Sequence, residues 1–326
     1  MAKLDIAEKR IPQDGRIQLK IQDKALDLRV STVPASRGES IVMRILDKSS
    51  ILKDISTLGF FPDDTDTINK IISLPDGVFL VTGPTGSGKT TSLYAFLNTV
   101  NSPTKKIITV EDPIEYNLDG INQVQVNASI NMTFATVLRS IMRQAPNIIM
   151  VGEIRDCETA EIAVNAALTG HLVFSTLHTN DAPSAITRLL DIGIKPFLVA
   201  SSVKAVMAQR LVRKVCANCA MPYEPTQAEL DVMKLDKNSL KNTNFQKGKG
   251  CEECHNSGFK GRLGIMEIFM LTENLQDMIF KEVSSYRIKE EARRSGMKTL
   301  REDGIRKVMA GLTTLEEVVG VSVEDI

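Results

Sequence analysis

The chain has 326 residues, and its 40 lysines and arginines balance its 40 aspartates and glutamates. Because a single hydrophobic core stops growing at about 250–300 residues, this length predicts two or more compact units. A formal net charge of zero excludes a global electrostatic preference for nucleic acid or anionic lipid. The sequence shows neither the apolar core of a signal peptide nor an uncharged apolar run of about 18 residues, so we expect a cytoplasmic protein.

The first predicted elements form a small β-rich unit over residues 16–46. Ile17, Leu19 and Ile21 alternate with polar neighbours, which is the period of a half-buried strand, and two further strand patterns follow. One helix is predicted next. The turn sequence Leu-Pro-Asp-Gly after that helix places a boundary near Pro75.

Short apolar runs then alternate with segments of helix length. Strands are predicted over residues 78–82, 106–110, 148–152 and 172–177. This alternation is typical of a parallel sheet covered by helices, so the predicted fold class is α/β. The clearest helix pattern covers residues 133–144 and places Arg139 and Arg143 together on one face, where the simplest interpretation is contact with solvent.

The pattern changes after about Arg213 to a cysteine-bearing segment, and from about Glu267 to a run of helices. Two pairs have the spacing of helix capping boxes: Thr299 with Glu302, and Thr314 with Glu317. Two glycines stand where helices should end: Gly296 and Gly311. We therefore expect four regions, with bounds 1–74, 75–213, 214–266 and 267–326.

Residues 83–90 read Gly-Pro-Thr-Gly-Ser-Gly-Lys-Thr and match the phosphate-binding pattern G-x-x-x-x-G-K-[ST] between a predicted strand and a predicted helix. The glycines allow a tight loop whose backbone N–H groups face an anion at the helix N-terminus. We expect Lys89 to reach the β- and γ-phosphates of a nucleotide and the Thr90 hydroxyl to bind Mg²⁺. The predicted nucleotide-binding residues are Gly83, Pro84, Thr85, Gly86, Ser87, Gly88, Lys89, Thr90 and Thr91.

Acidic side chains end two other predicted strands. Glu153 follows one of them and, at the carboxyl edge of the sheet, can complete the Mg²⁺ shell or position water. Glu111, Asp112 and Glu115 follow another, and spacing does not decide which of them orients a water nucleophile. Asp112 can instead cap a helix. His178 ends a further strand and can contact the γ-phosphate, although a lone histidine is more often structural.

Four of the five cysteines form two Cys-x-x-Cys pairs. Four thiolates are the ligand set of a closed structural Zn²⁺ site, and we predict zinc on Cys216, Cys219, Cys251 and Cys254. The segment 220–250 between the pairs is longer than in common zinc modules, so the metal would join the two ends of a long inserted segment. His255 is not expected to be a ligand, and the remaining Cys157 is expected to be a partly buried thiol.

Four segments, in order, resemble the sequence boxes of the secretion ATPases that drive type II secretion and type IV pilus assembly. They read GPTGSGKT, TVEDPIEY, RQAPNIIMVGEIRD and TGHLVFSTLHTN, and they resemble the Walker A, aspartate, Walker B and histidine boxes. The resemblance covers nearly the whole chain. It implies a RecA-like P-loop NTPase core with a small, truncated PAS-like N-terminal unit of α+β type, a zinc-binding insertion and a C-terminal helical region.

The resemblance also implies roles for individual residues. Lys89 and Thr90 would contact nucleotide and Mg²⁺, Glu153 would be the Walker B acid, and Glu115 would be favoured over its neighbours as the water activator. Two histidines fall in the histidine box: His171 and His178. The family's arginines that face the nucleotide or a neighbouring subunit correspond to Arg29, Arg44, Arg139 and Arg143.

Two departures from the family pattern are visible. Ala145 and Asn147 stand where the family usually has aspartates before the Walker B strand. In addition, residues 1–16 resemble an internal part of the family's second N-terminal domain, so we expect the chain to be a fragment.

The predicted function is that of a hexameric cytoplasmic ATPase that powers pseudopilus assembly and protein export. The paired cysteines resemble secretion and pilus-extension members and disfavour pilus retraction, so pilus extension is the alternative within the family. The expected partners are other copies of the chain and the inner-membrane platform and anchoring proteins, through which alone it would meet the membrane. No direct nucleic-acid partner is expected.

Two other kinds of function remain open. A nucleic-acid translocase on the same core would need stacking aromatics, yet the chain has no Trp and only 5% aromatic residues. A nucleotide-gated assembly module that hydrolyses little ATP is the third interpretation.

Overall fold

The computed structural model describes residues 1–21, 24–47, 54–235 and 243–322. The chain divides into two compact units, Met1–Lys53 and Asp54–Ile326. Each unit is described by itself. Residues 22–23 of the predicted β-rich unit lie outside the described residues.

The smaller unit is a three-stranded antiparallel sheet in the order β1 (Gln13–Ile21), β2 (Lys24–Ala35) and β3 (Gly38–Asp47). It confirms the strands predicted there, with β1 beginning three residues before the expected position 16. Arg16, Arg29 and Arg44 lie in register across the three strands. The Arg16 Nε–H donates to the carboxylate of the buried Asp27 at 2.7 Å, so this sheet holds a charged row beside a buried acid.

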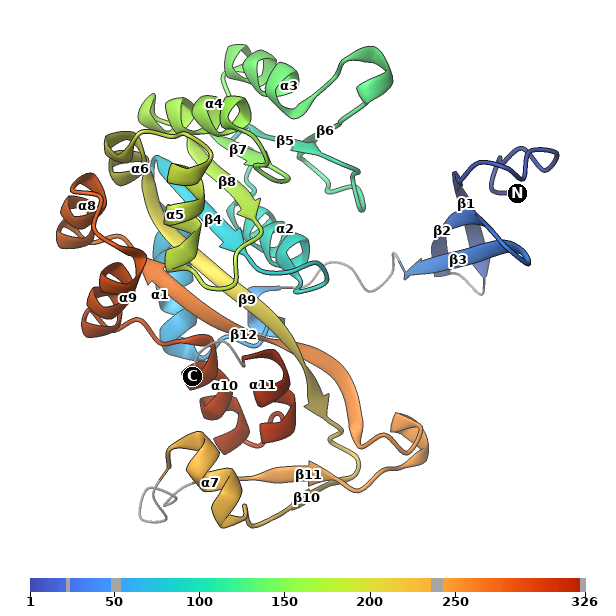
Figure 1. The fold of residues 1–326 in the computed structure, drawn as a ribbon, viewed down its shortest axis with the longest axis vertical. Coiled ribbons are helices and arrows are strands. Elements are labelled where there is room, and N and C mark those ends of the chain that lie inside the picture. The colour runs from blue at the N-terminus through green and yellow to red at the C-terminus, as the bar shows by residue number, and fades with distance from the viewer. Residues whose placement is uncertain (22–23, 48–53, 236–242, 323–326) are drawn as a thin grey trace. The chain divides into compact units, whose positions relative to one another are not determined.

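The larger unit is built on a seven-stranded sheet in the order β12-β9-β4-β8-β7-β5-β6 (Figure 1). Six of its strands run parallel: β4 (Gly77–Thr82), β5 (Ile107–Glu111), β6 (Asn122–Gln125), β7 (Ile148–Val151), β8 (Leu172–Leu177) and β9 (Val203–Val215). The edge strand β12 (Phe259–Met270) is antiparallel to β9. The four predicted strands are confirmed as β4, β5, β7 and β8, and all four are buried along their length.

Helices cover both faces of this sheet, because alternate side chains of each strand enter different cores. Phe79 and Val81 of β4 pack toward α1 (Pro62–Ile72) and α2 (Lys89–Val100). Val78 and Leu80 pack toward the opposite face. The helices on that face are α3 (Phe134–Ile141), α4 (Cys157–Leu168), α5 (Pro183–Asp191), α6 (Pro196–Ser202), α8 (Glu273–Phe280) and α9 (Ser285–Arg294). The sheet is therefore the middle of three layers.

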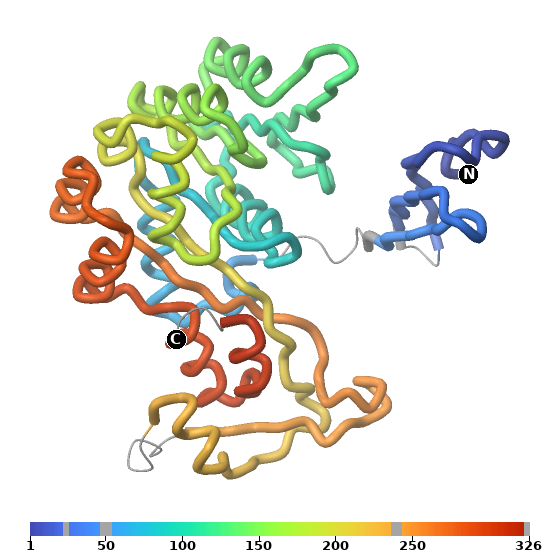
Figure 2. Tube along the Cα trace, viewed as in Figure 1, coloured from blue at the N-terminus to red at the C-terminus, as the bar shows by residue number. Residues whose placement is uncertain are grey.

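A third, smaller core joins the cysteine-bearing segment to the end of the chain. Leu230 and Met233 of α7 (Gln227–Met233) pack with Val308 of α10 (Leu300–Met309) and Val318 of α11 (Leu315–Val321). The short antiparallel pair β10 (Ala220–Pro222) and β11 (Gln246–Gly248) lies between α7 and the cysteines. In Figure 2 the chain leaves the sheet along β9 and returns along β12, so the cysteine segment extends from the sheet on two paired strands.

The helix-end predictions have different outcomes. The Thr299–Glu302 capping box is present at the start of α10, and Gly296 and Gly311 follow α9 and α10 with positive φ of 98° and 73°. Thr314 has no side-chain cap bond. Glu317 instead accepts hydrogen bonds from Arg213, because this acid faces β9 and not the helix terminus.

The contact-defined division at residues 53 and 54 comes earlier than the boundary expected near Pro75. The reason is that Ile68, Ile71 and Ile72 of α1 are buried in the core that also contains Phe96 of α2. The expected bounds at 213 and 266 fall inside β9 and β12, which both belong to the large sheet. No helix within the described residues is long and apolar enough to cross a membrane.

Candidate functional site

The glycine-rich loop joins the end of β4 to the start of α2. Gly83, Gly86 and Gly88 have φ of 146°, 81° and 90°, which strongly favours glycine at each position. A Cβ added to Gly83 would lie 2.5 Å from the Gln209 carbonyl oxygen, and one added to Gly88 would lie 2.8 Å from Gln209 Nε2. The loop thus follows a path that favours glycine at these three positions, and it leads directly into a helix N-terminus.

Lys89, the first residue of α2, reaches back over this loop. Its Nζ donates to the carbonyl oxygens of Gly83 at 2.7 Å and Pro84 at 3.0 Å. Burial lowers the pKa of Lys89, the nearby Glu153 opposes that shift, and Arg210 adds to it. Thr90 is exposed and Thr91 is half-buried on the same helical turn. The loop therefore combines an ammonium group, hydroxyl groups and backbone N–H groups at one helix end, which suits a polyphosphate.

Glu153 and His178 meet at the carboxyl ends of neighbouring strands. Glu153 follows β7, His178 follows β8, and the Glu153 Oε2 lies 3.5 Å from the His178 Nε2. The other carboxylate oxygen of Glu153 lies 2.6 Å from Arg155. The Glu153 side chain is only 14% exposed, so it is an acid held between two nitrogen groups, and one strand, β8, separates its strand from the P-loop strand.

The P-loop strand is also joined to the loop that follows His178. The Thr82 and Thr179 hydroxyl oxygens lie 2.8 Å apart, and the Thr179 N–H donates to Thr82 Oγ1 at 2.8 Å. The same loop is held by the carbonyl of Asn180, which accepts from the Arg210 guanidinium at 2.8 Å. These contacts fix the two strand ends that carry the loop and the histidine.

The acidic residues after β5 occupy three different environments. Glu111 is 3% exposed, and its carboxylate accepts from Thr109 Oγ1 at 2.6 Å and from Gln123 Nε2 at 3.0 Å. Asp112 is exposed and favours the charged form of Arg155. Glu115 is half-buried in the loop beyond them. Of the three acids, Glu111 is therefore buried inside the protein, whereas Asp112 is exposed and Glu115 is partly exposed.

The four cysteines of the two Cys-x-x-Cys pairs come together, with all four sulfurs within 4.8 Å of one another. The Sγ–Sγ distances are 3.9 Å for Cys216–Cys251, 3.8 Å for Cys219–Cys254 and 3.7 Å for Cys251–Cys254. Sulfurs at about 2.3 Å from a tetrahedral Zn²⁺ lie about 3.8 Å apart, so the cluster has the dimensions of a Zn²⁺ site. His255 is not one of these four.

Backbone groups favour the thiolate form at one of these positions. Burial alone would raise the pKa of the Cys254 thiol, but the N–H groups of Cys251 and Gly258 donate to its sulfur and, together with the neighbouring Cys251 and Cys219 thiols, lower the pKa to about 6. A thiolate is the form that binds metal. The donor set thus fits a closed structural site with no open position.

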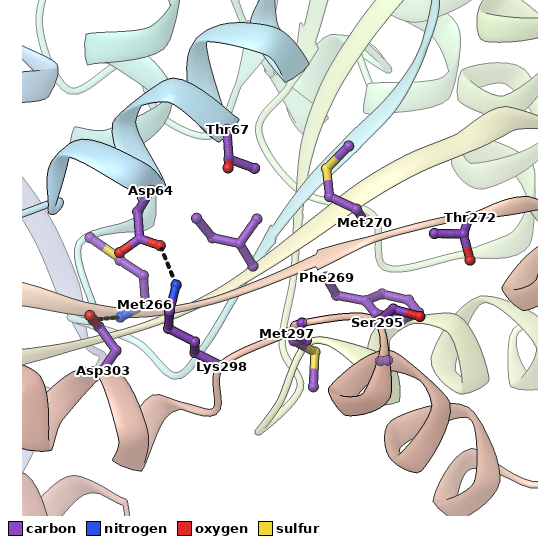
Figure 3. Close-up of a pocket in the computed structure, with 13 residues that line it drawn as sticks. Asp64, Thr67, Met266, Phe269, Met270, Thr272, Ser295, Met297, Lys298 and Asp303 are labelled. Atoms are coloured by element: carbon purple, nitrogen blue, oxygen red, sulfur yellow. Dashed lines mark hydrogen bonds and ion pairs between the residues drawn. The ribbon is translucent and has the colours of Figure 1, made fainter.

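A cavity of about 190 Å³ lies elsewhere, between α1, β12 and the segment that joins α9 to α10 (Figure 3). Met266 and Phe269 form part of its wall, and the Lys298 ammonium lies 3.5 Å from the Asp64 carboxylate at one side. None of the predicted site residues lines it. It is therefore separate from the phosphate-binding loop.

The Type II/IV secretion system protein family matches the chain over residues 1–320. The chain belongs to this family.

Relatives within the secretion family are similar over the whole of this chain. Type II secretion system protein E of Pseudomonas aeruginosa is 52% identical over 325 residues, covering 100% of this chain and 64% of the relative. Type II secretion system ATPase E of Vibrio cholerae is 51% identical, and the match covers 99% of this chain and 64% of that relative. Type IV pilus assembly ATPase PilB of Thermus thermophilus is 48% identical, with coverages of 99% and 36%. The chain thus spans just under two thirds of the secretion relatives.

Solved structures share the fold of this chain. The pilus retraction motor PilT with bound ADP aligns with a TM-score of 0.69 at 25% identity, covering 96% of this chain and 78% of that one. The ATPase DotB of Legionella pneumophila aligns with the same TM-score of 0.69 at 21% identity, and the alignment covers 96% of this chain and 78% of the DotB chain. DotB therefore shares the fold. This agreement confirms the α/β P-loop fold expected from the sequence.

The two histidines of the secretion family's histidine box are separated in the structure. His178 follows the carboxyl end of β8, whereas His171 precedes its amino end, where its Nδ1 lies 2.9 Å from the Ala166 carbonyl. Because β8 separates them, only His178 lies beside Glu153.

The four arginines expected from the secretion family divide between the two units. Arg139 pairs with Glu158 on α4, and Arg143 donates to the Arg139 carbonyl at 3.0 Å. Arg29 and Arg44 face each other across β2 and β3 of the smaller unit. No sequence motif marks the three other residues found near this site, Arg155, Arg210 and Gln209, although Arg155 lies only two residues from Glu153 in the sequence.

Proposed function

We propose that this chain is the motor portion of a secretion ATPase, which hydrolyses ATP to drive assembly of a pseudopilus and export of proteins. The observation that carries the proposal is the P-loop with Lys89 placed beside the Glu153–His178 pair at adjacent strand ends. Such a site binds a polyphosphate and holds an acid where phosphoryl transfer needs one. The similarity to the type II secretion proteins of Pseudomonas aeruginosa and Vibrio cholerae supports the type II system.

The residues around the P-loop would bind the phosphates, Mg²⁺ and the attacking water of the proposed reaction. The backbone of the loop from Gly83 to Gly88 would hold the phosphates, and Lys89 would exchange its bonds to the loop carbonyls for phosphate oxygens. Thr90 and Glu153 would hold Mg²⁺, directly or through water. A bound Mg²⁺ neutralises the charge that develops on the phosphoryl oxygens. Glu115, the accessible glutamate after β5, would orient the attacking water.

The remaining groups would support this reaction. His178 would fix Glu153 and respond to the γ-phosphate, and Zn²⁺ on the four cysteines would hold the excursion between β9 and β12 without entering the chemistry. Arg29, Arg44, Arg139 and Arg143 would complete sites between copies of the chain.

In this proposal the assembly is a homo-hexamer in the cytoplasm that binds inner-membrane platform and anchoring proteins. In the same proposal the chain has the four regions expected from the sequence: a partial second N-terminal domain with a linker (1–74), the RecA-like core (75–213), the metal-binding segment (214–266) and the C-terminal helices (267–326).

The test is ATP turnover by purified protein. Lys89→Ala is expected to abolish Mg²⁺-dependent ATP hydrolysis, because the β- and γ-phosphates lose their positive contact. Lys105→Ala, which removes an exposed lysine from the turn after α2, is the matched control and should retain wild-type turnover. Wild-type turnover in Lys89→Ala would refute the proposal.

Type IV pilus extension is the second candidate, supported by the 48% identity to the Thermus thermophilus pilus assembly ATPase. Complementation separates the two systems. A chimera carrying this chain in place of the matching region should restore export in a type II secretion mutant and fail to restore pili. Stimulation of turnover by DNA or RNA alone would instead favour a nucleic-acid translocase.

A further inference from the structure

Behind the acidic loop lies a buried polar cluster that the proposed chemistry does not use. Tyr94 of α2 is 1% exposed, and its hydroxyl donates to the carboxylate of Glu111, which is 3% exposed at the end of β5. Gln123 of β6 donates to the other oxygen of Glu111 at 3.0 Å. Three side chains from three elements thus form one hydrogen-bonded unit inside the protein.

The same side chains hold the backbone of the loop that carries Glu115. The Glu115 N–H donates to the Tyr94 hydroxyl oxygen at 3.4 Å. Gln123 Nε2 donates to the Tyr116 carbonyl at 3.1 Å, and Gln123 Oε1 accepts from the Leu118 N–H at 2.7 Å. The Tyr116 ring packs edge-on against Tyr94, with centroids 4.5 Å apart. Side chains from α2 and β6 therefore hold residues 115–118 through three hydrogen bonds and one ring contact.

We propose that Tyr94 is a positioning residue for hydrolysis, which sets the place of Glu115 relative to the phosphate-binding loop. The proposal rests on the proposed ATPase function. Tyr94 stands on the same helix as Lys89 and Thr90, five and four residues further along, so one rigid element carries both the phosphate contacts and the support of the acidic loop. Displacement of a reacting group by about 1 Å can slow a reaction about 100-fold.

Glu111 has the role of an anchor in this arrangement. Both of its oxygens accept hydrogen bonds from neutral donors, namely Tyr94, Thr109 and Gln123. Burial raises the pKa of the Tyr94 hydroxyl, and the charge of Glu111 raises it further, so Tyr94 remains a neutral donor. A buried carboxylate with these partners is poorly placed to take a proton from water, whereas Glu115 is only half-buried.

The first experiment compares Tyr94→Phe with wild type. The substitution keeps the ring and removes the hydroxyl, so kcat should fall roughly 10- to 100-fold while the Kd for nucleotide changes less than about twofold. Tyr223→Phe removes a hydroxyl from the distant third core and should leave kcat unchanged. A wild-type kcat in Tyr94→Phe would overturn the proposal, as would an equal loss in nucleotide affinity.

A double-mutant cycle tests whether Tyr94 acts through Glu115. In a Glu115→Gln background, adding Tyr94→Phe should lower the residual rate less than about twofold, because the group that it positions has already been removed. The same fold-loss in both backgrounds would show that Tyr94 acts elsewhere and would overturn the proposal. If Glu111 were the base, Tyr94→Phe would shift the acidic limb of the pH–rate profile, which we expect to stay in place.

Amide hydrogen exchange provides a measurement that does not depend on turnover. Tyr94→Phe should speed exchange in the segment 115–118, and Tyr223→Phe should not. Unchanged exchange would refute the positioning role whatever the activity. If exchange responds while the wild type hydrolyses no ATP, the ATPase proposal has failed and the structural role of Tyr94 stands.

Discussion

Glu153 and His178 end neighbouring strands, and 3.5 Å separates the Oε2 of the first from the Nε2 of the second. The two residues are 25 positions apart in the sequence and meet only because β7 pairs with β8 in parallel. The carboxylate also lies 2.6 Å from Arg155, so its orientation is fixed from both sides.

This pair leads to the first prediction. Glu153→Gln preserves the shape of the side chain and removes its charge, so kcat should fall about 100-fold or more while nucleotide still binds. His178→Gln, which loosens the carboxylate without removing it, should lower kcat about tenfold. Turnover and fluorescent-nucleotide binding measure the two effects. Glu161→Gln changes an exposed acid on α4 and should match wild type; a Glu153→Gln enzyme as active as this control would contradict the assigned role.

The cysteine cluster provides the second prediction. Purified protein should contain one Zn²⁺ per chain by elemental analysis, and Cys216→Ser or Cys251→Ser should lower both the zinc content and the thermal stability. Cys157→Ser is the matched control, because Cys157 lies on α4 outside the cluster. Full zinc content after loss of Cys216 would show that these four sulfurs do not form the site.

Ala145 provides the third prediction. It has φ of 47°, in the left-handed region, and its side chain is exposed before β7. An alanine in this conformation is less stable than glycine by about 1–2 kcal/mol, and part of this is offset by the greater freedom of glycine in the unfolded chain. Ala145→Gly should therefore raise the free energy of unfolding by roughly 0.5–1 kcal/mol.

The reciprocal change provides its control. Gly170 has φ of 96°, and a Cβ there would have no atom within 4 Å, so Gly170→Ala adds conformational strain without a clash. This variant should lose about 1 kcal/mol in chemical denaturation. Destabilisation by Ala145→Gly would mean that the loop before β7 adopts another backbone conformation.

Glu317 provides the fourth prediction, on pH. Hydrogen bonds from the Arg213 side chain hold the pKa of Glu317 below its usual value, and the Arg213 N–H contributes as well. A carboxylate whose pKa is lowered by folding contributes stability that is complete above its unfolded pKa of about 4.3 and is lost as pH falls through the folded pKa.

Glu317→Gln should therefore lower the free energy of unfolding by about 1 kcal/mol at pH 7, a value that allows for the exposure of Arg213 to solvent. The difference from wild type should shrink as the pH falls below about 4. Denaturant unfolding at pH 7, 5 and 3.5 measures this. Glu316→Gln, an exposed neighbour 3.8 Å from Lys247, should change stability by less than about 0.5 kcal/mol at each pH.

The central strands could be predicted because each is an uninterrupted apolar run buried on both faces. The outer strands of the sheet could not. The edge strand β6 reads Asn-Gln-Val-Gln and is partly exposed, and β9, which lies next to the other edge strand, carries Arg210, Arg213 and Lys214 beyond its pairing with β4. Strand segments that contact solvent have a composition that does not distinguish them from loops.

The candidate site divides in the same way. The glycine loop and the cysteine pairs are local patterns whose spacing encodes their geometry, so their residues could be named in advance. The Tyr94–Gln123 contact joins residues 29 positions apart, and the Arg213–Glu317 contact joins residues 104 apart. Such contacts depend on how helices pack on the sheet, which periodicity does not specify. The capping box predicted at Thr314 was wrong, because the Glu317 carboxylate accepts hydrogen bonds from Arg213 on β9 and does not cap the helix.

The cysteine segment begins and ends at facing positions of one strand pair, where the Cys216 N–H donates to the Gly258 carbonyl at 3.0 Å and Phe259 pairs with Val215. Because the ends of the segment are already side by side, the entropy of closing it grows only slowly with its length. An insertion grafted at this point can be lengthened, shortened or exchanged during evolution while the strands that carry the nucleotide loop keep their register. The strand pair β9 and β12 is thus an attachment point at which the same nucleotide-binding core can carry different inserted segments.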